Sequence, residues 1–341
     1  MFNSLEDFSG ILQRDLPAPN RLFQETARQR EALLTKPAGA LGRLEELTLW
    51  LAGWREGGRL RINQPATLVF AGNHGVTAHG ISPYPAKVTE QMVANFAAGG
   101  AAINAIAASV GSSLKVIPLN IEQPTDDITA APAMSENDLL DALNTGACAI
   151  PFAGDLFAFG EMGIGNTTVA AALAASCFGG AGKDWAGPGT GLDEAGVQKK
   201  AEVIDRALKQ HEGAQTAVDR LRCLGGRELA AIAGAVLAAR RARIPVILDG
   251  FVVTAAIAPL FVENPGIVDH CVAGHVSKEP GHRKLLEAMK LTPLLDLSMR
   301  LGEGTGATLA IGVLKAAVAA HNEMATFQQA GVSGSEGDEA Q

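Results

Sequence analysis

Short runs of apolar, often β-branched residues alternate along the chain with longer segments whose apolar positions have a helical spacing. Most of these runs end in glycine or a polar residue, and the runs show no regular alternation with polar residues. Such runs are typical of strands that are buried on both faces of a parallel sheet. They lie at residues 66–72, 114–120, 147–154, 244–249 and 267–272.

The segments between these runs are rich in alanine and glycine, which allows helices to lie close on a sheet. They predict helices at residues 86–111, 167–178, 193–210, 227–243 and 282–291. Regular alternation of strands and helices predicts an α/β fold of three layers, in which helices cover both faces of a Rossmann-like, mostly parallel sheet.

Both ends of the chain depart from this alternation. The stretch from Leu5 to about Trp54 is predicted to be helical, and a last helix is expected from Ala307 to about Phe327. We therefore expect a small helical domain built from residues 1–60 and 307–330, beside a large α/β domain of residues 61–306. Residues 331–341 are rich in Gly, Ser and Glu, which predicts a disordered tail.

Composition and charge narrow the class of protein. The 341 residues are 47% hydrophobic and 19% charged, so the chain can bury a large core. A net charge of −8 without a long basic cluster argues against binding of nucleic acid. The longest apolar stretch, 244–262, is interrupted by Asp249 and Pro259, and no membrane span is expected.

Cysteine usage and the start of the chain bear on localisation. The four cysteines are far apart, which is typical of reduced thiols and not of a disulfide framework. The first twenty residues show no basic segment followed by an apolar one, as a secretory signal would have. We expect a cytoplasmic protein.

In an open parallel sheet, ligands bind beyond the carboxyl ends of the strands. The predicted strand ends carry residues 73–75, 160–161, 249–250 and 274–275. Among the remaining acidic residues in these segments, Asp249 is the strongest candidate for a ligand contact. The alternative is that its carboxylate only caps the turn that follows.

One acidic residue stands between glycines at the start of the last helix. Glu303 lies in Arg300-Leu-Gly-Glu-Gly-Thr-Gly-Ala307, where its neighbours have no side chains to keep a flat ligand away from the carboxylate. Glu303 is therefore a candidate general base. The alternative is a loop glutamate that stabilises the helix N-terminus through the helix dipole.

Two further glycine-rich turns are candidates for binding an anion. Residues 160–168, Gly-Glu-Met-Gly-Ile-Gly-Asn-Thr-Thr, end at a predicted helix, where free N–H groups and hydroxyls could hold a phosphate or could simply cap the helix. Residues 187–191, Gly-Pro-Gly-Thr-Gly, precede a helix that carries Lys199 and Lys200. This second turn could equally be a plain loop beside a solvated helix.

Several familiar signatures are missing. The turn after the first predicted strand lacks GxGxxG, which disfavours a nicotinamide-dependent oxidoreductase, and GxSxG is absent as well. The histidines show no HxH or HxxxH spacing, so we expect no metal site.

Five motifs together resemble one family, the nicotinate-nucleotide:dimethylbenzimidazole phosphoribosyltransferases, in order and over nearly the whole chain. Two positions depart from the family pattern: Asn73 stands where Asp is frequent, and Ala40 where Ser is frequent. The motifs are Lys36-Pro-Ala-Gly-Ala-Leu-Gly-Arg-Leu-Glu45, Gly72-Asn-His-Gly-Val76, Gly160-Glu-Met-Gly-Ile-Gly-Asn-Thr-Thr168, Leu248-Asp-Gly-Phe251 and Arg300-Leu-Gly-Glu-Gly-Thr-Gly-Ala307.

The resemblance implies roles for individual residues. Glu303 matches the family's catalytic base, and the benzimidazole pocket is implied at Glu161 and at the segment from Ser82 to Met92, where either Gln91 or Met92 faces the base. The phosphoribosyl group is implied near the two glycine-rich turns and Lys200. The complete predicted substrate-binding set is Ser82, Gln91, Met92, Glu161, Gly163, Gly165, Asn166, Thr167, Thr168, Gly189, Thr190, Gly191, Lys200, Asp249, Gly250, Leu301, Gly302 and Gly304.

The implied activity is transfer of the phosphoribosyl group of nicotinate mononucleotide to 5,6-dimethylbenzimidazole, with inversion at the anomeric carbon. The products are α-ribazole 5′-phosphate, for the nucleotide loop of cobalamin, and nicotinate. No cofactor or metal is implied, and family members are similar to known homodimers. Two other classes stay open at this point: a nicotinamide-dependent oxidoreductase, and a non-catalytic module that binds nucleotides or benzimidazoles.

Overall fold

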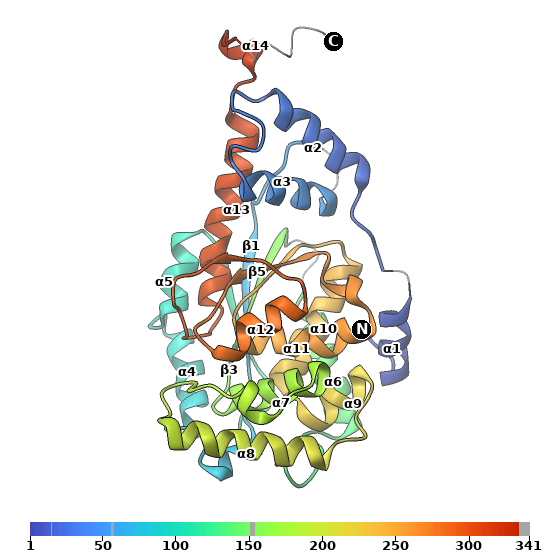
Figure 1. Ribbon diagram of the computed structural model, residues 1–341, viewed down its shortest axis with the longest axis vertical. Helices are drawn as coiled ribbons and strands as arrows, with labels where there is room; N and C mark the ends of the chain where they lie inside the picture. The colour runs from blue at the N-terminus through green and yellow to red at the C-terminus, as the bar shows by residue number, and fades with distance from the viewer. Residues whose placement is uncertain (15, 56–57, 151–153, 334–341) are drawn as a thin grey trace.

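The computed structural model describes residues 1–14, 16–55, 58–150 and 154–333 (Figure 1). Six strands form one sheet in the order β2-β1-β3-β4-β5-β6, and every neighbouring pair is parallel. The predicted α/β fold with a parallel sheet is confirmed. The strands are β1 (Pro65–Ala71), β2 (Ser113–Pro118), β3 (Leu156–Met162), β4 (Val246–Leu248), β5 (Cys271–His275) and β6 (Pro293–Leu295).

Helices cover both faces of the sheet. Three short 3-10 helices lie in the connections: η1 (Gly75–His79) between β1 and α4, η2 (Gly182–Asp184) between α7 and α8, and η3 (Pro265–Val268) between α11 and β5. The α-helices are α1 (Leu5–Gln13), α2 (Arg21–Leu33), α3 (Arg43–Trp54), α4 (Lys87–Ala97), α5 (Ala102–Ser109), α6 (Glu136–Cys148), α7 (Asn166–Phe178), α8 (Glu194–Gln210), α9 (Ala217–Leu224), α10 (Arg227–Arg241), α11 (Phe251–Glu263), α12 (Pro280–Ala288), α13 (Thr305–Glu323) and α14 (Phe327–Ala330).

Strand β3 shows how the three layers are held together, because successive side chains of a strand point to opposite faces. Phe157 and Phe159 belong to the large apolar core that also contains residues of α7, α10 and α11. Leu156 and Ala158 lie in a second core, against Ala307 and other residues of α13. All four side chains are fully buried, which explains the lack of polar alternation in the sequence.

The strand order places a topological switch point between β1 and β3. The chain passes from β1 to β2 on one side and then returns to place β3 on the other side of β1. At such a point the connections leave the two strand ends in opposite directions and open a crevice. The carboxyl ends of β1 and β3 adjoin, since the N–H of Gly72 donates to the carbonyl of Met162 over 3.0 Å.

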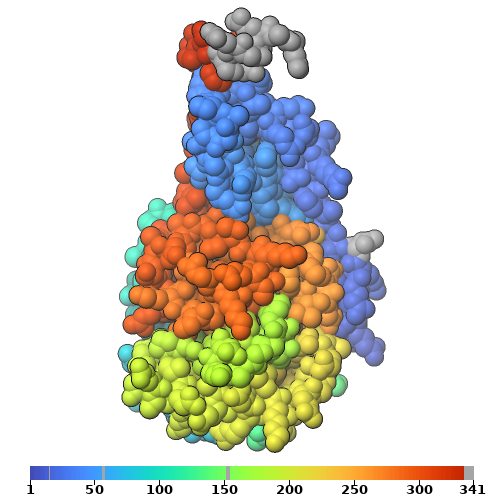
Figure 2. All heavy atoms as spheres, in the orientation of Figure 1, coloured from blue at the N-terminus to red at the C-terminus, as the bar shows by residue number. Residues whose placement is uncertain are grey.

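A smaller helical unit projects from the amino-terminal side of the sheet (Figures 1 and 2). It contains α2, α3 and the carboxyl-terminal half of α13, with Ala27, Leu51 and Val318 in its own apolar cluster. Helix α1 instead packs on the large unit, where Phe8 and Leu12 join the main core. The domain limits given above stay a prediction, and most of the predicted tail, residues 334–341, lies outside the described residues.

Two predicted strands were placed wrongly. In the run 147–154, Ala147 and Cys148 belong to α6, residues 151–153 lie outside the described part, and the strand is β3. Ala149 and Ile150, which directly follow α6, are apolar because they join the main core. In the run 267–272, Ile267 and Val268 form part of η3, so β5 starts only at Cys271. Strand β6 was not predicted, because its three residues are too few to form a recognisable apolar run.

The predicted helix 86–111 is broken into α4 and α5 around Gly99 and Gly100. Among the described residues, the stretch Lys87–Ser109 is the one helical segment that is long and apolar enough to cross a membrane by length and composition, with a mean hydropathy of 1.3. Only 22% of its most apolar window is buried. Most exposed positions of this stretch are the small residues alanine and glycine, whereas Phe96 and Ile103 are buried.

Helices α6 and α10 approach so closely that only glycine fits at their contact. A Cβ atom at Gly146 would lie 1.7 Å from the carbonyl oxygen of Ala231, and one at Gly234 would lie 2.0 Å from that of Leu143. We expect Gly146→Ala to lower the free energy of unfolding by about 1–3 kcal/mol, because overpacking against backbone outweighs the gain in helix propensity. Urea unfolding tests this, with Gly213→Ala as the control, since a Cβ there meets nothing within 4 Å. Equal stability of the Gly146 variant and the wild type would contradict it.

Candidate active site

The loop that carries Glu303 lies against the carboxyl ends of β3 and β4. Three consecutive residues of this loop have positive φ: Gly302 at 81°, Glu303 at 61° and Gly304 at 80°. For the non-glycine Glu303 this left-handed conformation costs about 1–2 kcal/mol, and it is typical of residues held at functional sites. Glycine is required on both sides, because a Cβ at Gly302 would lie 2.5 Å from Oε1 of Glu161 and Gly304 packs on the backbone of Gly160.

Asp249 holds this loop in place from the end of β4. Its side chain is completely buried, and its two carboxylate oxygens accept hydrogen bonds from the backbone N–H groups of Gly304 over 3.0 Å and Ala307 over 2.9 Å. Nδ1 of His275 lies 3.5 Å from the same carboxylate. Asp249 therefore caps the N-terminus of α13, a segment far away in sequence, and not the turn that follows it.

Burial makes two of the nearby carboxyl groups unusually weak acids. Burial, and secondarily the charge of Asp249, raises the pKa of Glu303 to about 7. The same two causes raise the pKa of Glu161 to about 8, although the hydrogen bond from Asn166 acts in the opposite direction. Glu303 is thus close to half ionised near neutral pH, as suits a general base, while Glu161 is mostly protonated.

The predicted turn at residues 163–168 joins β3 to α7 beside these acids. The amide of Asn166 donates to Glu161, and the hydroxyl of Thr89 on α4 accepts from the backbone N–H of Ile164 over 3.2 Å. Thr168 is completely buried, and its hydroxyl has no partner among the described residues. The structure therefore brings Glu161 and Asn166 together and turns Thr168 inward.

Lys200 reaches the same region from α8, whereas its neighbour Lys199 is exposed. The side chain of Lys200 is 1% exposed, and Nζ donates to Oγ1 of Thr167 over 2.7 Å and to the carbonyl of Gly187 over 3.1 Å. Burial lowers the pKa of Lys200 to about 8, against the opposing charge of Glu279. A buried ammonium group therefore joins the two predicted glycine-rich turns.

The second turn is held by residues that the sequence did not indicate. Gly189 has a φ of 55°, and its carbonyl accepts from Nη1 of Arg300 over 3.3 Å. Glu279 is buried close to Gly187, and burial raises the pKa of its carboxyl group. Thr190 and Gly191, by contrast, are exposed.

The other predicted positions are more scattered. Ser82 is half-buried and lines a shallow cavity of about 530 Å³ next to η1. Met92 is half-buried against Val69 and Phe96, whereas Gln91 is exposed on α4. Gly250 is buried at the start of α11, and Leu301 is exposed. Which of Gln91 and Met92 faces a ligand stays a prediction.

A buried histidine and a buried glutamate interact beside the turn that precedes α7. Nε2 of His74 lies 2.6 Å from Oε1 of Glu228, and both side chains are fully buried. A Cβ at Gly163 would lie 3.0 Å from that carboxylate and 3.1 Å from the imidazole, so the pair supports the turn before α7. His74 lies at a predicted strand end, but nothing in the sequence pairs it with Glu228, which is 154 residues away. Among the described residues, no three His, Cys, Asp or Glu side chains are grouped to hold a metal ion.

A buried carboxylate with a pKa near neutral and a buried lysine between glycine-rich turns form an α/β enzyme site suited to a reaction in which an anionic group is bound and a proton is removed. The comparisons agree, because the phosphoribosyltransferase family model DBI_PRT matches residues 16–332. A nicotinate-nucleotide–dimethylbenzimidazole phosphoribosyltransferase of Novosphingobium aromaticivorans is 54% identical over 97% of this chain and 98% of that protein. The one of Brucella anthropi is also 54% identical, over 97% of both.

Solved structures show the same relationship. The crystal structure of CobT from Thermus thermophilus superimposes with a TM-score of 0.86 at 42% identity, covering 92% of this chain and 99% of that one. The chain therefore belongs to the nicotinate-nucleotide–dimethylbenzimidazole phosphoribosyltransferase family.

Proposed function

We propose that the protein transfers the phosphoribosyl group of nicotinate mononucleotide to 5,6-dimethylbenzimidazole, with inversion of the anomeric carbon. The products are α-ribazole 5′-phosphate and nicotinate. The observation that carries this proposal is Glu303, a carboxylate that is 5% exposed, has a raised pKa and lies in a loop fixed by Asp249. The names of the relatives at 54% identity support the substrates.

The reaction requires one base and no acid. The pyridinium of the donor departs as a neutral ring, so it takes up no proton. The attacking nitrogen of the benzimidazole uses its lone pair, and the opposite N–H becomes acidic as positive charge develops in the ring. Glu303 accepts that proton, while the charge of Asp249 raises the basicity of Glu303.

The protonation of Glu161 supports this division of roles. With a pKa of about 8, Glu161 is a poor proton acceptor at neutral pH, but its protonated carboxyl can donate a hydrogen bond in the benzimidazole pocket. Holding the two rings on opposite faces of the ribose contributes much of the acceleration, since positioning can supply several kcal/mol. No protein nucleophile takes part in a single inverting displacement.

In this proposal the phosphate of the donor binds Lys200 and the two turns that Lys200 joins. We expect Lys200→Met to raise the KM for nicotinate mononucleotide by about tenfold to a hundredfold, because a charge-assisted phosphate contact is lost. Because the pKa of Lys200 is lowered to about 8, the KM of the wild type should also rise as the pH passes above 8 and the ammonium loses its proton. Steady-state kinetics from about pH 7 to 9 test both points, with exposed Lys199→Met as the control. An unchanged KM would remove Lys200 from the phosphate site.

The direct test of the proposed function is incubation of the purified protein with nicotinate mononucleotide and 5,6-dimethylbenzimidazole. Chromatography and mass spectrometry should show nicotinate and α-ribazole 5′-phosphate in equal amounts. Binding of both substrates without release of nicotinate would indicate a non-catalytic binding module instead.

We also propose that the protein is a cytoplasmic homodimer that binds neither nucleic acid nor membrane. The exposed alanines and glycines of α4, α5 and the turn between them, which would allow a second copy to approach closely, support pairing at this face. The cysteines, which are all free, support a reducing compartment. Light scattering should give twice the chain mass of 35.2 kDa. A monomer at micromolar concentration would contradict the proposed dimer.

A further inference from the structure

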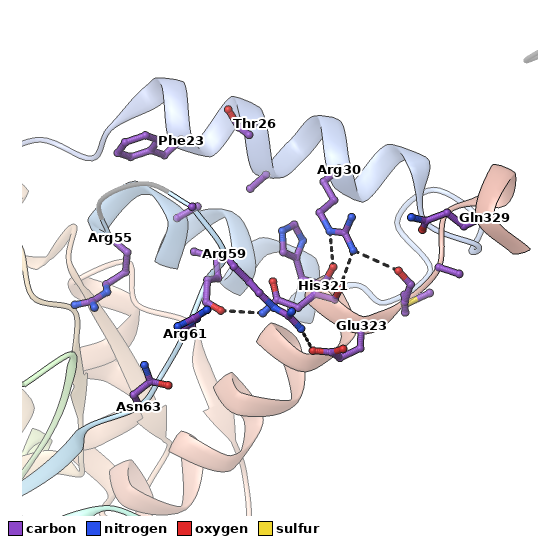
Figure 3. Close-up of a pocket in the computed structure, with 17 residues that line it drawn as sticks. Phe23, Thr26, Arg30, Arg55, Arg59, Arg61, Asn63, His321, Glu323 and Gln329 are labelled. Atoms are coloured by element: carbon purple, nitrogen blue, oxygen red, sulfur yellow. Dashed lines mark hydrogen bonds and ion pairs between the residues drawn. The ribbon is translucent and has the colours of Figure 1, made fainter.

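A large cavity lies in the small helical unit, far along α13 from Glu303 (Figure 3). Its volume is about 1160 Å³, and its walls come from α2, the end of α3, the segment before β1 and the end of α13. Small-molecule sites commonly have volumes of about 300–1,000 Å³. The cavity is therefore large enough for a nucleotide, and the proposed reaction does not use it.

Arginines dominate the lining of this cavity. Among the described residues, Arg30, Arg55, Arg59 and Arg61 line it against one acidic residue, Glu323, which gives these side chains together a formal charge of +3. The chain as a whole carries −8. A cluster of positively charged side chains in a cavity of an acidic protein indicates an anionic ligand.

The backbone presents two of these arginines on one side. Arg59, Arg61 and Asn63 are exposed and line the cavity at alternate positions, whereas Leu60 is buried and Ile62 half-buried in the apolar cluster of the helical unit. Alternate residues of an extended segment point the same way. This burial fixes the direction of the guanidinium groups toward the cavity.

The positive charge is only partly neutralised by the protein. Arg30 donates to the carbonyls of His321, Asn322 and Met324, at distances of 2.8–3.3 Å, so that its charge meets no carboxylate among the described residues. Arg59 pairs with Glu323, but both side chains are more than half exposed, where such a pair contributes little. In the described part of the chain, no carboxylate lies within ion-pair distance of Arg61.

The opposite wall is apolar. Phe23 of α2 lines this wall (Figure 3), and Ala27 and Ala52 line the cavity as well. Guanidinium forks match phosphate oxygens bidentately, and an aromatic ring can stack on a flat base. We propose that this cavity is a second ligand site that binds a nucleoside triphosphate, with its phosphates on Arg59 and Arg61 and its base on the apolar wall.

Calorimetric titration of the full chain with ATP in about 0.15 M salt, where exposed charges are screened as in the cell, tests the proposal. We expect saturable binding of one ATP per chain, weaker binding of AMP and none of adenosine. Arg59→Ala/Arg61→Ala should weaken ATP binding by at least about tenfold, the scale of one lost charge-assisted contact. Arg61→Ala alone breaks no ion pair among the described residues. It should weaken ATP binding less than the double substitution does.

Two controls separate this site from the catalytic crevice. Arg28→Ala/Arg241→Ala removes the same charge from exposed positions outside the cavity and should leave ATP binding unchanged. Lys200→Met should also leave it unchanged. Absence of saturable binding at millimolar ATP would overturn the proposal. So would loss of binding in Lys200→Met with retention in the double arginine variant, which would place the nucleotide in the crevice. Neither result bears on the assay for nicotinate release.

Discussion

Replacing Glu303 with glutamine is expected to lower kcat by about two orders of magnitude or more, the usual scale for loss of a general base. Glutamine has almost the same shape and can keep the left-handed backbone, but its amide cannot accept the proton of the benzimidazole. The KM for nicotinate mononucleotide should change little, because the proposed phosphate site is at Lys200 and not at Glu303. Steady-state kinetics at about pH 8, where the wild-type carboxylate is mostly ionised, measure both constants.

The pH profile provides the control for this prediction. Glu303 accepts a proton only when ionised, so the kcat of the wild type should rise with pH through about 7 and then level off. The part of the profile in which kcat rises is its acid limb. The remaining activity of Glu303→Gln should lack this acid limb. A kcat within a few-fold of the wild type, or a variant that keeps the limb, would show that another group is the base.

Removing the charge of Asp249 is expected to change both the plateau value of kcat and the pH at which the acid limb lies. Without the neighbouring carboxylate, the pKa of Glu303 falls, so the acid limb should move to lower pH in Asp249→Asn. An asparagine amide has one acceptor oxygen, so it cannot keep the hydrogen bonds of both Gly304 and Ala307. A buried unsatisfied group costs about 1–3 kcal/mol, and we expect kcat at the plateau to fall by about tenfold to a hundredfold.

The two effects together distinguish a positioning role for Asp249 from a purely structural one. General destabilisation would lower the amount of active enzyme without moving the limb. Asp141→Asn, at an exposed position on α6, removes one carboxylate charge far from the crevice and should leave both limb and plateau unchanged. A normal plateau with an unmoved limb in Asp249→Asn would remove Asp249 from this role.

Parts of the site were predictable because they depend on local backbone chemistry. Glycines around Glu303 indicated a loop with unusual backbone freedom, and the loop does use the left-handed region at Gly302 and Gly304. The strand-end rule likewise directed attention to Glu161 and Asp249. The partners of these residues could not be predicted, because Asp249 binds backbone groups 55 and 58 residues away.

Other features became visible only in three dimensions. Nothing in the sequence separates Lys199 from Lys200, yet the packing of α8 buries one and exposes the other. The run 147–154 was assigned to a strand because a short apolar run gives no periodicity that separates a strand from a buried helix end. The arginine-lined cavity needs both ends of the chain, and no local pattern joins Arg30 to Glu323.

The sequence by itself determined the alternation of strands and helices, the family and the identity of the acidic residue between glycines, because periodicity and backbone freedom are properties of neighbouring residues. Tertiary structure alone decided which carboxyl groups are weak acids, which lysine is buried and what holds the Glu303 loop. Those properties depend on desolvation and on contacts between segments that are distant in the chain. Burial beside Asp249 brings the pKa of Glu303 to about 7, and that burial exists only in the folded protein.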